Sequence, residues 1–260
     1  MLDLVSRLRE AGCVFAEDEA RLLLAQARTV AELDAMVERR TAGLPLEQVL
    51  GWAEFCGLRV RVAPGVFVPR RRTEFLAQQA LAALGPTAVE LCCGTGAISA
   101  VLLAARPVEV HAVDLDPTAV RCARENLPAA WVYEGDLYEP LPARLHGHVD
   151  VLVANAPYVP NEELELLPPE ARLHEPRMAL DGGSDGLDVL RRVIVGAPRW
   201  LAPGGQVLVE TSERQAPVLV GTVAASGLVA RVVSDEELGA TVVIGTRATD
   251  GPDAPGPARR

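Results

Sequence analysis

The sequence of 260 residues predicts an α/β protein built on a doubly wound, seven-stranded, mostly parallel sheet. Two observations predict this fold class. Beyond Thr73, seven short apolar runs alternate with segments of helical periodicity. Polar residues and glycines follow several of these runs directly, and open sheets of this kind bind ligands at the carboxyl ends of their strands. A small N-terminal helical domain and a linking β-hairpin are expected before the sheet.

The N-terminal part of the chain reads as helical. Apolar residues recur at helical spacing among Arg and Glu over residues 2–40, and Gly43 and Pro45 then break the pattern. In "LRVRVAPGVFVP", apolar residues alternate with arginines before a Pro-Gly turn, as in a half-exposed hairpin. The expected domain boundaries are 1–56 for the helical domain, 57–72 for the hairpin linker, 73–247 for the sheet domain and 248–260 for a disordered tail.

The seven apolar runs are the expected strands. They read "TAVEL", "VEVHAVD", "WVYEGD", "VDVLVAN", "GGQVLVE", "LVARVVSD" and "TVVIGTR". Hydrophobic residues make up 49% of the chain, which suffices for a substantial core.

Composition excludes several classes of function. The net charge of -10 argues against a surface that coats nucleic acid, because neutralising phosphates needs clustered basic residues. Five cysteines without a C-x-x-C pair indicate reduced thiols, and no histidine has the partners of a metal site. The charged N-terminus is unlike a signal peptide, and the uncharged stretch 216–230 is too short to span a bilayer. We expect a cytoplasmic protein, monomeric, with no metal and no membrane partner.

A glycine turn follows the first expected strand. In "VELCCGTGAIS", Glu90 ends the strand and Gly94-Thr95-Gly96 leads into a helix, so that a ligand can approach the backbone closely. A tight strand-to-helix turn alone would also need glycine. The next strand ends in Asp114, 20 positions after Gly94, where a carboxylate suits both hydroxyls of a ribose. Asp116 before Pro117 fits a helix N-cap, which leaves Asp114 for a nucleoside.

The third and fourth strands are followed by further candidate residues. In "EGDLYEPL", Asp136 can accept from an adenine amino group while Leu137 or Tyr138 covers the ring, or it is a solvated turn acid. The fourth strand ends in Asn155-Ala156-Pro157-Tyr158.

This tetrapeptide suits a planar NH2 group. The Asn155 Oδ1 and the Ala156 carbonyl can each accept one hydrogen, and Tyr158 can stack beside the plane. The alternatives are an Asn turn closed by Pro157 and a tyrosine that caps the core. A nicotinamide dehydrogenase shares the glycine turn and the later acid, but Ser99 stands where its third glycine belongs.

These residues, in this order, make the chain resemble the class I S-adenosyl-L-methionine-dependent methyltransferases, and specifically the protein-(glutamine-N5) methyltransferases that modify peptide release factors. The resemblance runs from Arg39 to Arg247 and includes "PLEQVLGWAEFCGLRVRVAPGVFVPRRRTE", "GDLYEPL", "EPRMALDGGSDGLDVLRRV" and "DEELGATVVIG". It implies S-adenosyl-L-methionine as cofactor, S-adenosyl-L-homocysteine as product, and a protein substrate held by the helical domain.

The resemblance also implies roles for individual residues. In the family an Asn-Pro-Pro-Tyr motif grips the glutamine amide, so the catalytic residues implied are Asn155, Ala156, Pro157 and Tyr158. The cofactor-binding residues implied are Phe67, Pro69, Arg70, Glu90, Cys92, Gly94, Gly96, Asp114, Leu115, Asp136, Leu137 and Asn155.

The chain departs from the family pattern at several positions. Cys92 replaces the first glycine of the cofactor turn, and Ala156 replaces the first proline of the tetrapeptide, so the backbone there is less restricted. Arg71 and Arg72 stand in place of a proline and an acid. The alternative functions are an adenine-N6 nucleic-acid methyltransferase, a ribosomal-protein glutamine methyltransferase, an NAD-dependent dehydrogenase and a cofactor-binding module without catalysis.

Overall fold

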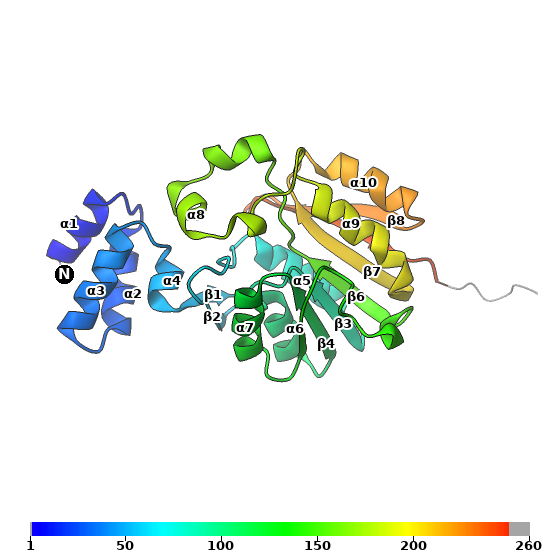
Figure 1. The fold of residues 1–260 in the computed structure, drawn as a ribbon, viewed down its shortest axis with the longest axis horizontal. Coiled ribbons are helices and arrows are strands. Elements are labelled where there is room, and N and C mark those ends of the chain that lie inside the picture. The colour runs from blue at the N-terminus through cyan, green and yellow to red at the C-terminus, as the bar shows by residue number, and fades with distance from the viewer. Residues whose placement is uncertain (1, 250–260) are drawn as a thin grey trace, which may run out of the picture.

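The computed structural model describes residues 2–249, so the tail expected over 248–260 lies almost wholly outside it. The chain opens with three helices, α1 (Leu2–Glu10), α2 (Ala16–Gln26) and α3 (Val30–Thr41). They pack around a core of their own that includes Leu8, Leu23 and Val37. Figure 1 shows these helices at one end of the molecule. Thr29 caps α3 by accepting the Glu32 N–H at 3.1 Å.

Arg40 joins this helical unit to the sheet domain. Its Nε lies 2.6 Å from Oε2 of Glu19 in α2, and its Nη1 lies 2.6 Å from Oε1 of Glu170 in α8 (Pro169–His174). The Arg40 and Glu19 side chains are only 11% and 9% exposed. Paired charges that are this deeply buried depend on each other, because neither has water to replace its partner.

Replacing Arg40 by alanine should therefore lower the free energy of unfolding by about 3–5 kcal/mol, since Glu19 would keep a buried, unpaired charge. Urea denaturation followed by circular dichroism measures the loss. Glu170 is 42% exposed, so Glu170→Gln is the matched control and should cost about 1 kcal/mol or less. Equal losses in the two variants would contradict the expectation.

The hairpin lies earlier in the chain than expected. After the short helix α4 (Leu46–Leu50), strands β1 (Trp52–Phe55) and β2 (Leu58–Arg61) pair in antiparallel register. The turn is Cys56-Gly57, both at positive φ (48° and 74°), as a two-residue hairpin loop requires. The paired strands therefore lie outside the expected hairpin boundaries of 57–72, because cysteine is not a residue type that indicates a left-handed backbone. The expected Pro64-Gly65 turn does form, with the Val66 N–H donating to the Ala63 carbonyl at 3.2 Å, but it does not connect two paired strands. Residues 62–72 form no helix or strand.

The main sheet has seven strands, as predicted. They are β3 (Thr87–Leu91), β4 (Glu109–Asp114), β5 (Trp131–Glu134), β6 (Val149–Ala154), β7 (Leu201–Thr211), β8 (Val229–Asp235) and β9 (Ala240–Thr246), in the order β5-β4-β3-β6-β7-β9-β8. Every neighbouring pair is parallel except those that β9 makes with β7 and β8. From β3 the chain adds β4 and β5 toward one edge of the sheet, and it then returns to β6 and adds β7 toward the other edge. The strand order therefore reverses between β3 and β6, and this topological switch point is where such sheets bind ligands.

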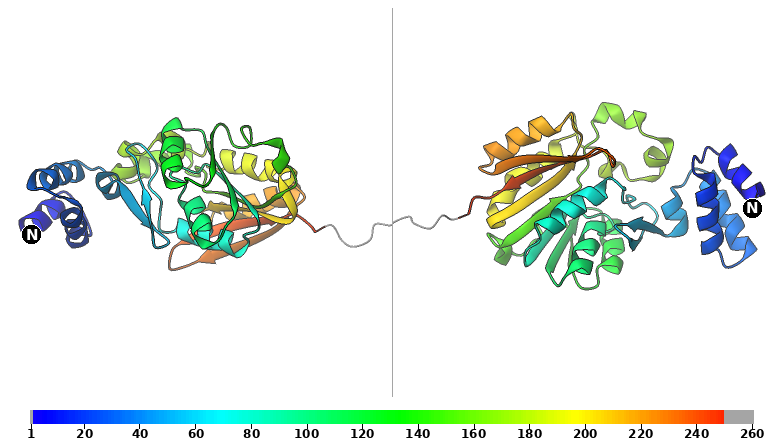
Figure 2. Two further views of the ribbon diagram at one scale, coloured as in Figure 1. Left: turned by 90° about the horizontal axis from the view of Figure 1, so that it is seen from below. Right: turned by 180° about the vertical axis from the view of Figure 1, so that it is seen from behind.

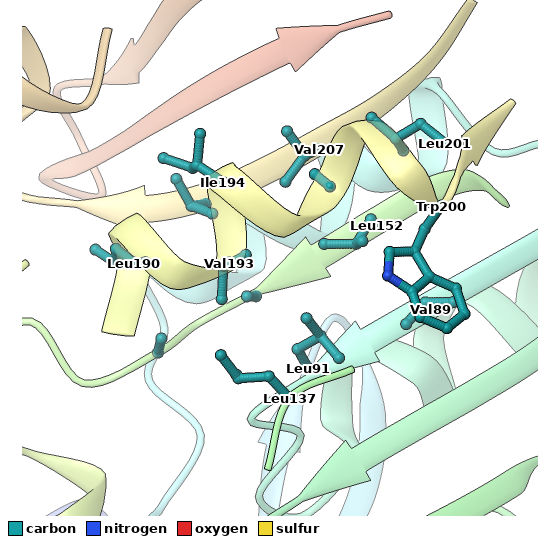
Figure 3. Packing of buried hydrophobic residues seen from close by; sticks show 14 of the residues in the cluster. Val89, Leu91, Leu137, Leu152, Leu190, Val193, Ile194, Trp200, Leu201 and Val207 are labelled. Carbon is teal, nitrogen blue, oxygen red and sulfur yellow. The ribbon is translucent and has the colours of Figure 1, made fainter. Parts of the chain in front are cut away.

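Helices cover both faces of the sheet (Figure 2). Helices α5 (Thr73–Ala82), α6 (Ala97–Ala105) and α7 (Pro117–Asn126) pack on one face, and α9 (Asp188–Gly196) and α10 (Ala216–Ala225) pack on the other. Strand residues alternate between the two cores: Val151 and Val153 face α5 and α6, whereas Leu152 faces α9. Figure 3 shows the core between the sheet and helices α9 and α10. Its labelled members include Val89, Leu91, Leu152, Leu190, Val193, Ile194, Trp200 and Val207.

Short 3-10 helices lie in the connections between β5 and β7. They are η1 (Ala143–Leu145), η2 (Asn161–Leu166), η3 (Arg177–Ala179) and η4 (Ala197–Arg199). The segment from η2 through α8 to η3 follows β6 and the tetrapeptide. Figure 1 shows α8 between the N-terminal helices and the sheet domain. This segment therefore lies next to the carboxyl ends of the strands, where a ligand is expected.

Candidate active site

A cavity of about 510 Å³ opens at the carboxyl ends of β3, β4 and β6. Its walls contain almost every site residue that the sequence indicated: Phe67, Pro69, Arg70, Glu90, Cys92, Gly94, Asp114, Leu115, Asp136, Leu137, Asn155, Ala156, Pro157 and Tyr158. Gly96 is the exception among them. The cavity lies at the switch point of the sheet, and its volume is in the range of ordinary small-molecule sites.

The two glycines of the turn have different roles, because Gly94 faces open space and Gly96 packs against another helix. Gly94 has a φ of 54°, and a Cβ built on it would meet nothing within 4 Å, so the backbone is open toward a ligand. Gly96 has a φ of 75° and lies against Leu127, whose Cδ1 would be 2.5 Å from an added Cβ. Gly96 is thus required for the packing of α6 on the end of α7. Cys92 also has a positive φ, 54°, a conformation that residues other than glycine rarely adopt.

Asp114 holds the turn and the next helix together at the end of β4. Its Oδ2 accepts the Gly94 N–H at 2.7 Å, and its Oδ1 accepts the Asp116 N–H at 2.9 Å. Burial raises the pKa of Asp114, and these two N–H groups oppose the rise. Each carboxylate oxygen can accept a second hydrogen bond, so the side chain remains able to bind a ligand. The predicted N-cap is confirmed: Asp116 accepts the Thr118 N–H at 2.8 Å, with Pro117 next.

Asp136 and two leucines line the far side of this part of the cavity. Oδ2 of Asp136 lies 2.7 Å from Nη2 of Arg192 in α9, an ion pair that sequence reasoning missed. Leu137 is buried at a φ of 50°, and Leu115 is 55% exposed at the cavity. One carboxylate oxygen between two apolar side chains offers a flat ring both contact and a hydrogen-bond acceptor.

Glu90 is buried in β3 behind the glycine turn. Its Oε2 accepts the Ser99 N–H at 2.9 Å in the first turn of α6. Burial raises the pKa of Glu90 to about 7, against this hydrogen bond. The cavity thus has a carboxyl group beside it that gains or loses a proton near neutral pH.

Replacing Glu90 by glutamine should remove the pH dependence that this carboxyl imposes on folding. The raised pKa means that the folded protein holds the proton more tightly, so stability falls as the pH rises from about 4.5 through about 7. We expect E90Q to exceed the wild-type free energy of unfolding by on the order of 1–3 kcal/mol near pH 8, and by nothing near pH 4. Urea denaturation at both pH values measures this. A similar gain in E134Q, whose carboxylate is exposed, would contradict it.

The tetrapeptide after β6 faces the same cavity from the acceptor side. Nδ2 of Asn155 donates to Oγ1 of Thr73, the first residue of α5, at 3.1 Å. The side chain of Ala156 is buried in the core, 2% exposed, which anchors the backbone at this point. The Tyr158 carbonyl accepts from Nε2 of Gln215 at 3.0 Å, and Nε2 also donates to the Asp185 carbonyl. The backbone of the tetrapeptide is therefore held at both ends.

Glu210, at the end of β7, lies beneath the tetrapeptide. It is 1% exposed, and its Oε1 accepts the Tyr158 hydroxyl at 3.1 Å and lies 3.4 Å from Nε of Arg72. The Arg72 guanidinium lies 5.8 Å above the Tyr158 ring. Burial raises the pKa of Glu210, and donation from Thr73, Tyr158 and the charge of Arg72 oppose the rise. Arg72, which the sequence marked only as a departure from the family pattern, here places its positive charge next to the Glu210 carboxylate.

One wall of the cavity is tied to the segment around α8. Glu175 is buried, its Oε1 accepts the Val68 N–H at 3.1 Å, and its Oε2 pairs with Arg70. The Arg70 guanidinium lies 4.7 Å above the Phe67 ring. These contacts hold residues 67–70 against the α8 segment, and both segments contribute to the wall of the cavity.

Sequence reasoning missed Thr73, Glu175, Arg192, Glu210 and Gln215. For Glu210 a signal existed: an acid ends the apolar run "GGQVLVE", as Asp114 ends "VEVHAVD". The other missed residues lie in helices or loops, and nothing local distinguishes them from surface polar residues.

Within residues 2–249, no group of three or more His, Cys, Asp or Glu side chains is placed to hold a metal ion. In the same part of the chain, no helix has the length and apolar character needed to cross a bilayer.

The sequence is similar to several known proteins. The release factor glutamine methyltransferase of Geobacter sulfurreducens is 37% identical over 219 residues, which cover 82% of this chain and 76% of that protein. The protein of the same name from Cereibacter sphaeroides is 38% identical over 250 residues, which cover 86% and 88% of the two chains. The chain belongs to the release factor glutamine methyltransferase family. The methyltransferase small domain family also matches, over residues 57–185.

The fold agrees with this family membership. A methyltransferase from Pyrococcus furiosus superposes with a TM-score of 0.57 at 17% identity, covering 83% of this chain and 98% of that one. The seven-stranded sheet with one reversed strand is thus the class I methyltransferase fold, as the sequence predicted.

Proposed function

We propose that this protein transfers a methyl group from S-adenosyl-L-methionine to the side-chain amide nitrogen of a glutamine in a peptide chain release factor. Membership of the release factor glutamine methyltransferase family supports the proposal. The observation that carries it is the meeting of two clusters in one cavity. The Asp114 cluster suits a nucleoside, and the tetrapeptide from Asn155 to Tyr158 suits a planar amide.

The residues present fit S-adenosyl-L-methionine. Asp114 would accept from the ribose hydroxyls, and Asp136 with Leu115 and Leu137 would hold the adenine. Gly94 leaves its backbone open toward the amino-acid part of the cofactor, beside Glu90. When bound, this cofactor supplies an electrophilic methyl group on a positively charged sulfur.

On the acceptor side, the protein would act by positioning. Oδ1 of Asn155 and the Ala156 carbonyl would each accept one hydrogen of the glutamine NH2 group, which fixes the plane of the amide and directs the nitrogen toward the methyl carbon. Tyr158 would cover that plane, exclude water and offer its ring to the positive charge that develops on nitrogen. Its hydroxyl, held by Glu210, keeps the ring in place.

No general base is needed at the nitrogen. With the methyl group on nitrogen and S-adenosyl-L-homocysteine left as product, one N–H of the positively charged amide would be acidic enough to lose its proton to the solvent outside the site. The two oxygen acceptors, preorganised by Thr73 and by the buried Ala156, stabilise the positive charge before the proton leaves.

The release factor is proposed as partner in preference to nucleic acid. The net charge of -10 disfavours a polyanion, although Arg70, Arg71 and Arg72 lie next to one another near the cavity. Translation termination takes place in the cytoplasm, so the proposal places the protein there.

Mass spectrometry of release factors tests the function directly. Purified protein is incubated with S-adenosyl-L-methionine and an unmethylated release factor, and we expect one methyl group on one glutamine. A factor with that glutamine replaced by glutamate is the control. Methylation of adenine in a nucleic acid, or of a ribosomal protein alone, would overturn the proposal in favour of those alternatives. Cofactor binding without any methylation would indicate a binding module.

A further inference from the structure

The carboxyl groups in the cavity wall differ in whether a positive charge accompanies them. Four of them lie within 4.0 Å of an arginine nitrogen: Glu170 of Arg40, Glu175 of Arg70, Glu210 of Arg72 and Asp136 of Arg192. Within residues 2–249, four others have no arginine or histidine nitrogen at that distance: Glu47, Glu90, Asp114 and Asp116. The cavity therefore contains negative charge that no nearby basic side chain balances.

Three of these unpaired carboxyls lie around the glycine turn. Glu90 in β3 and Asp114 at the end of β4 come from neighbouring parallel strands, and the Gly94 N–H donates to Asp114 at 2.7 Å. Asp116 caps α7, whereas Glu90 is only 3% exposed. A buried carboxylate without a countercharge is unfavourable, because nothing offsets its lost hydration. This part of the cavity therefore favours a cationic ligand.

The elements packed around Glu90 bring no positive charge to it among the described residues. Its register partners in β4 and β6 are Ala112 and Val153. Helix α6 donates the Ser99 N–H to its Oε2 at 2.9 Å and has no ionisable side chain. One hydrogen bond from a neutral group is thus what the surrounding helix offers to this carboxyl.

The titratable groups that act on Glu90 are Asp114 from β4 and the thiols of Cys92 and Cys93 from the turn. Burial raises the pKa of both thiols well above its usual value, so the thiols are uncharged at neutral pH. Burial also raises the pKa of Glu90 to about 7, and the charge of Asp114 adds to this rise. Glu90 can therefore exchange its proton when a charged ligand arrives or leaves.

We propose that Glu90, supported by Asp114, is a specificity-determining residue that makes the site prefer the positively charged methyl donor to its neutral thioether product. This inference rests on the proposed function for the identity of the cofactor. Bound S-adenosyl-L-methionine brings the countercharge that the two carboxylates lack, and its charge acts strongly in a cavity from which water is largely excluded. After methyl transfer that charge is gone, so Glu90 takes up a proton from solvent and the product is held less tightly.

Binding measurements on Glu90→Gln test the preference. Calorimetry gives the affinities for S-adenosyl-L-methionine and S-adenosyl-L-homocysteine, and their ratio is compared between proteins. Near pH 8 we expect this ratio to be about tenfold higher in the wild type than in E90Q, as when a bound cation lowers the pKa of a neighbouring acid by about one. Near pH 5.5 the two proteins should agree, because Glu90 is then uncharged. Groups on the ligands titrate alike in both proteins, so the comparison cancels them.

Two controls separate charge from other causes. E134Q removes an exposed carboxylate that does not line the cavity, and it should keep the wild-type ratio at both pH values. An analogue with a primary ammonium group in place of the methyl sulfonium carries the charge without the methyl group. It should show the same difference between wild type and E90Q as S-adenosyl-L-methionine. If the analogue instead behaves like S-adenosyl-L-homocysteine, contacts with the methyl group and not charge make the selection, and the inference is overturned.

Proton release gives a second readout. Calorimetry near pH 7 in two buffers of different ionisation enthalpy should show that S-adenosyl-L-methionine releases more protons from the wild type than from E90Q, and that S-adenosyl-L-homocysteine does not. If E90Q does not fold, infrared difference spectra of the wild type replace it: the band of a protonated carboxyl should weaken with S-adenosyl-L-methionine and persist with the product. Equal proton release in the two proteins, or a band that neither ligand changes, would overturn the inference.

None of these measurements requires a release factor, so the inference and the proposed function can fail separately. If the wild type methylates no release factor but shows the charge preference that E90Q lacks, the function fails and the role of Glu90 is supported. If the wild type methylates the factor and E90Q keeps the wild-type ratio at both pH values, the function stands and the role of Glu90 is refuted.

Discussion

Replacing Asn155 by alanine should lower the rate of methyl transfer by on the order of 100-fold or more while the affinity for S-adenosyl-L-methionine stays nearly unchanged. The variant loses one of the two oxygens that we propose for the glutamine NH2 group, and with it the fixed plane of the reacting amide. The cofactor part of the cavity keeps Asp114 and the glycine turn, which hydrogen-bond to each other while Asn155 bonds to Thr73 elsewhere in the same cavity.

Single-turnover kinetics give the rate, and calorimetry gives the cofactor affinity. Asn161→Ala is a matched control, because Asn161 follows the tetrapeptide closely but does not line the cavity. A large loss of cofactor affinity in Asn155→Ala would contradict its assignment to the acceptor. A rate within a fewfold of the wild type would contradict a catalytic role altogether.

Replacing Asp114 by alanine should weaken cofactor binding by on the order of 100-fold, because hydrogen bonds to a charged group contribute about 1.5–3 kcal/mol each and the ribose would lose two of them. The glycine turn also loses its anchor, since Asp114 accepts the N–H groups of Gly94 and Asp116. Calorimetric titration with S-adenosyl-L-homocysteine measures the effect, without any contribution from the chemical step.

Asp114→Asn separates the two contributions. Its amide oxygen can still accept one of the two backbone N–H groups, so the turn should be less disturbed and the affinity should lie between that of the wild type and that of Asp114→Ala. Thermal melting of both variants reports the cost to the fold. If Asp114→Ala binds the cofactor as tightly as the wild type, the nucleoside site has been placed on the wrong residues.

Most of the fold could be read from local patterns. The seven runs became strands β3 to β9 because their apolar residues alternate between two helical layers, and Asp116 with Pro117 marked the start of α7 without any tertiary information. The hairpin was the exception. Its turn depends on Cys56 at positive φ, a conformation that cysteine rarely adopts and that its presence in a sequence therefore does not predict.

The site was predictable only in part. Asp114, Asp136 and Asn155 were found because each follows a strand, and parallel strands bring their carboxyl ends to one edge of the sheet. Arg192 and Glu175 were not found, because an ion pair between a helix and a distant turn leaves no pattern in the sequence.

The amino-acid sequence by itself determined the sheet, its two covering layers and the residues that end its strands, because periodicity, glycine turns and helix caps act over a few residues. Tertiary structure alone decided which side chains support those residues. Asn155 reaches Thr73 across 82 positions of sequence, and Tyr158 reaches Glu210 across 52. Contacts at such separations depend on how α5 and β7 pack beside β6, and only the folded chain brings their polar groups together in a place that water does not reach.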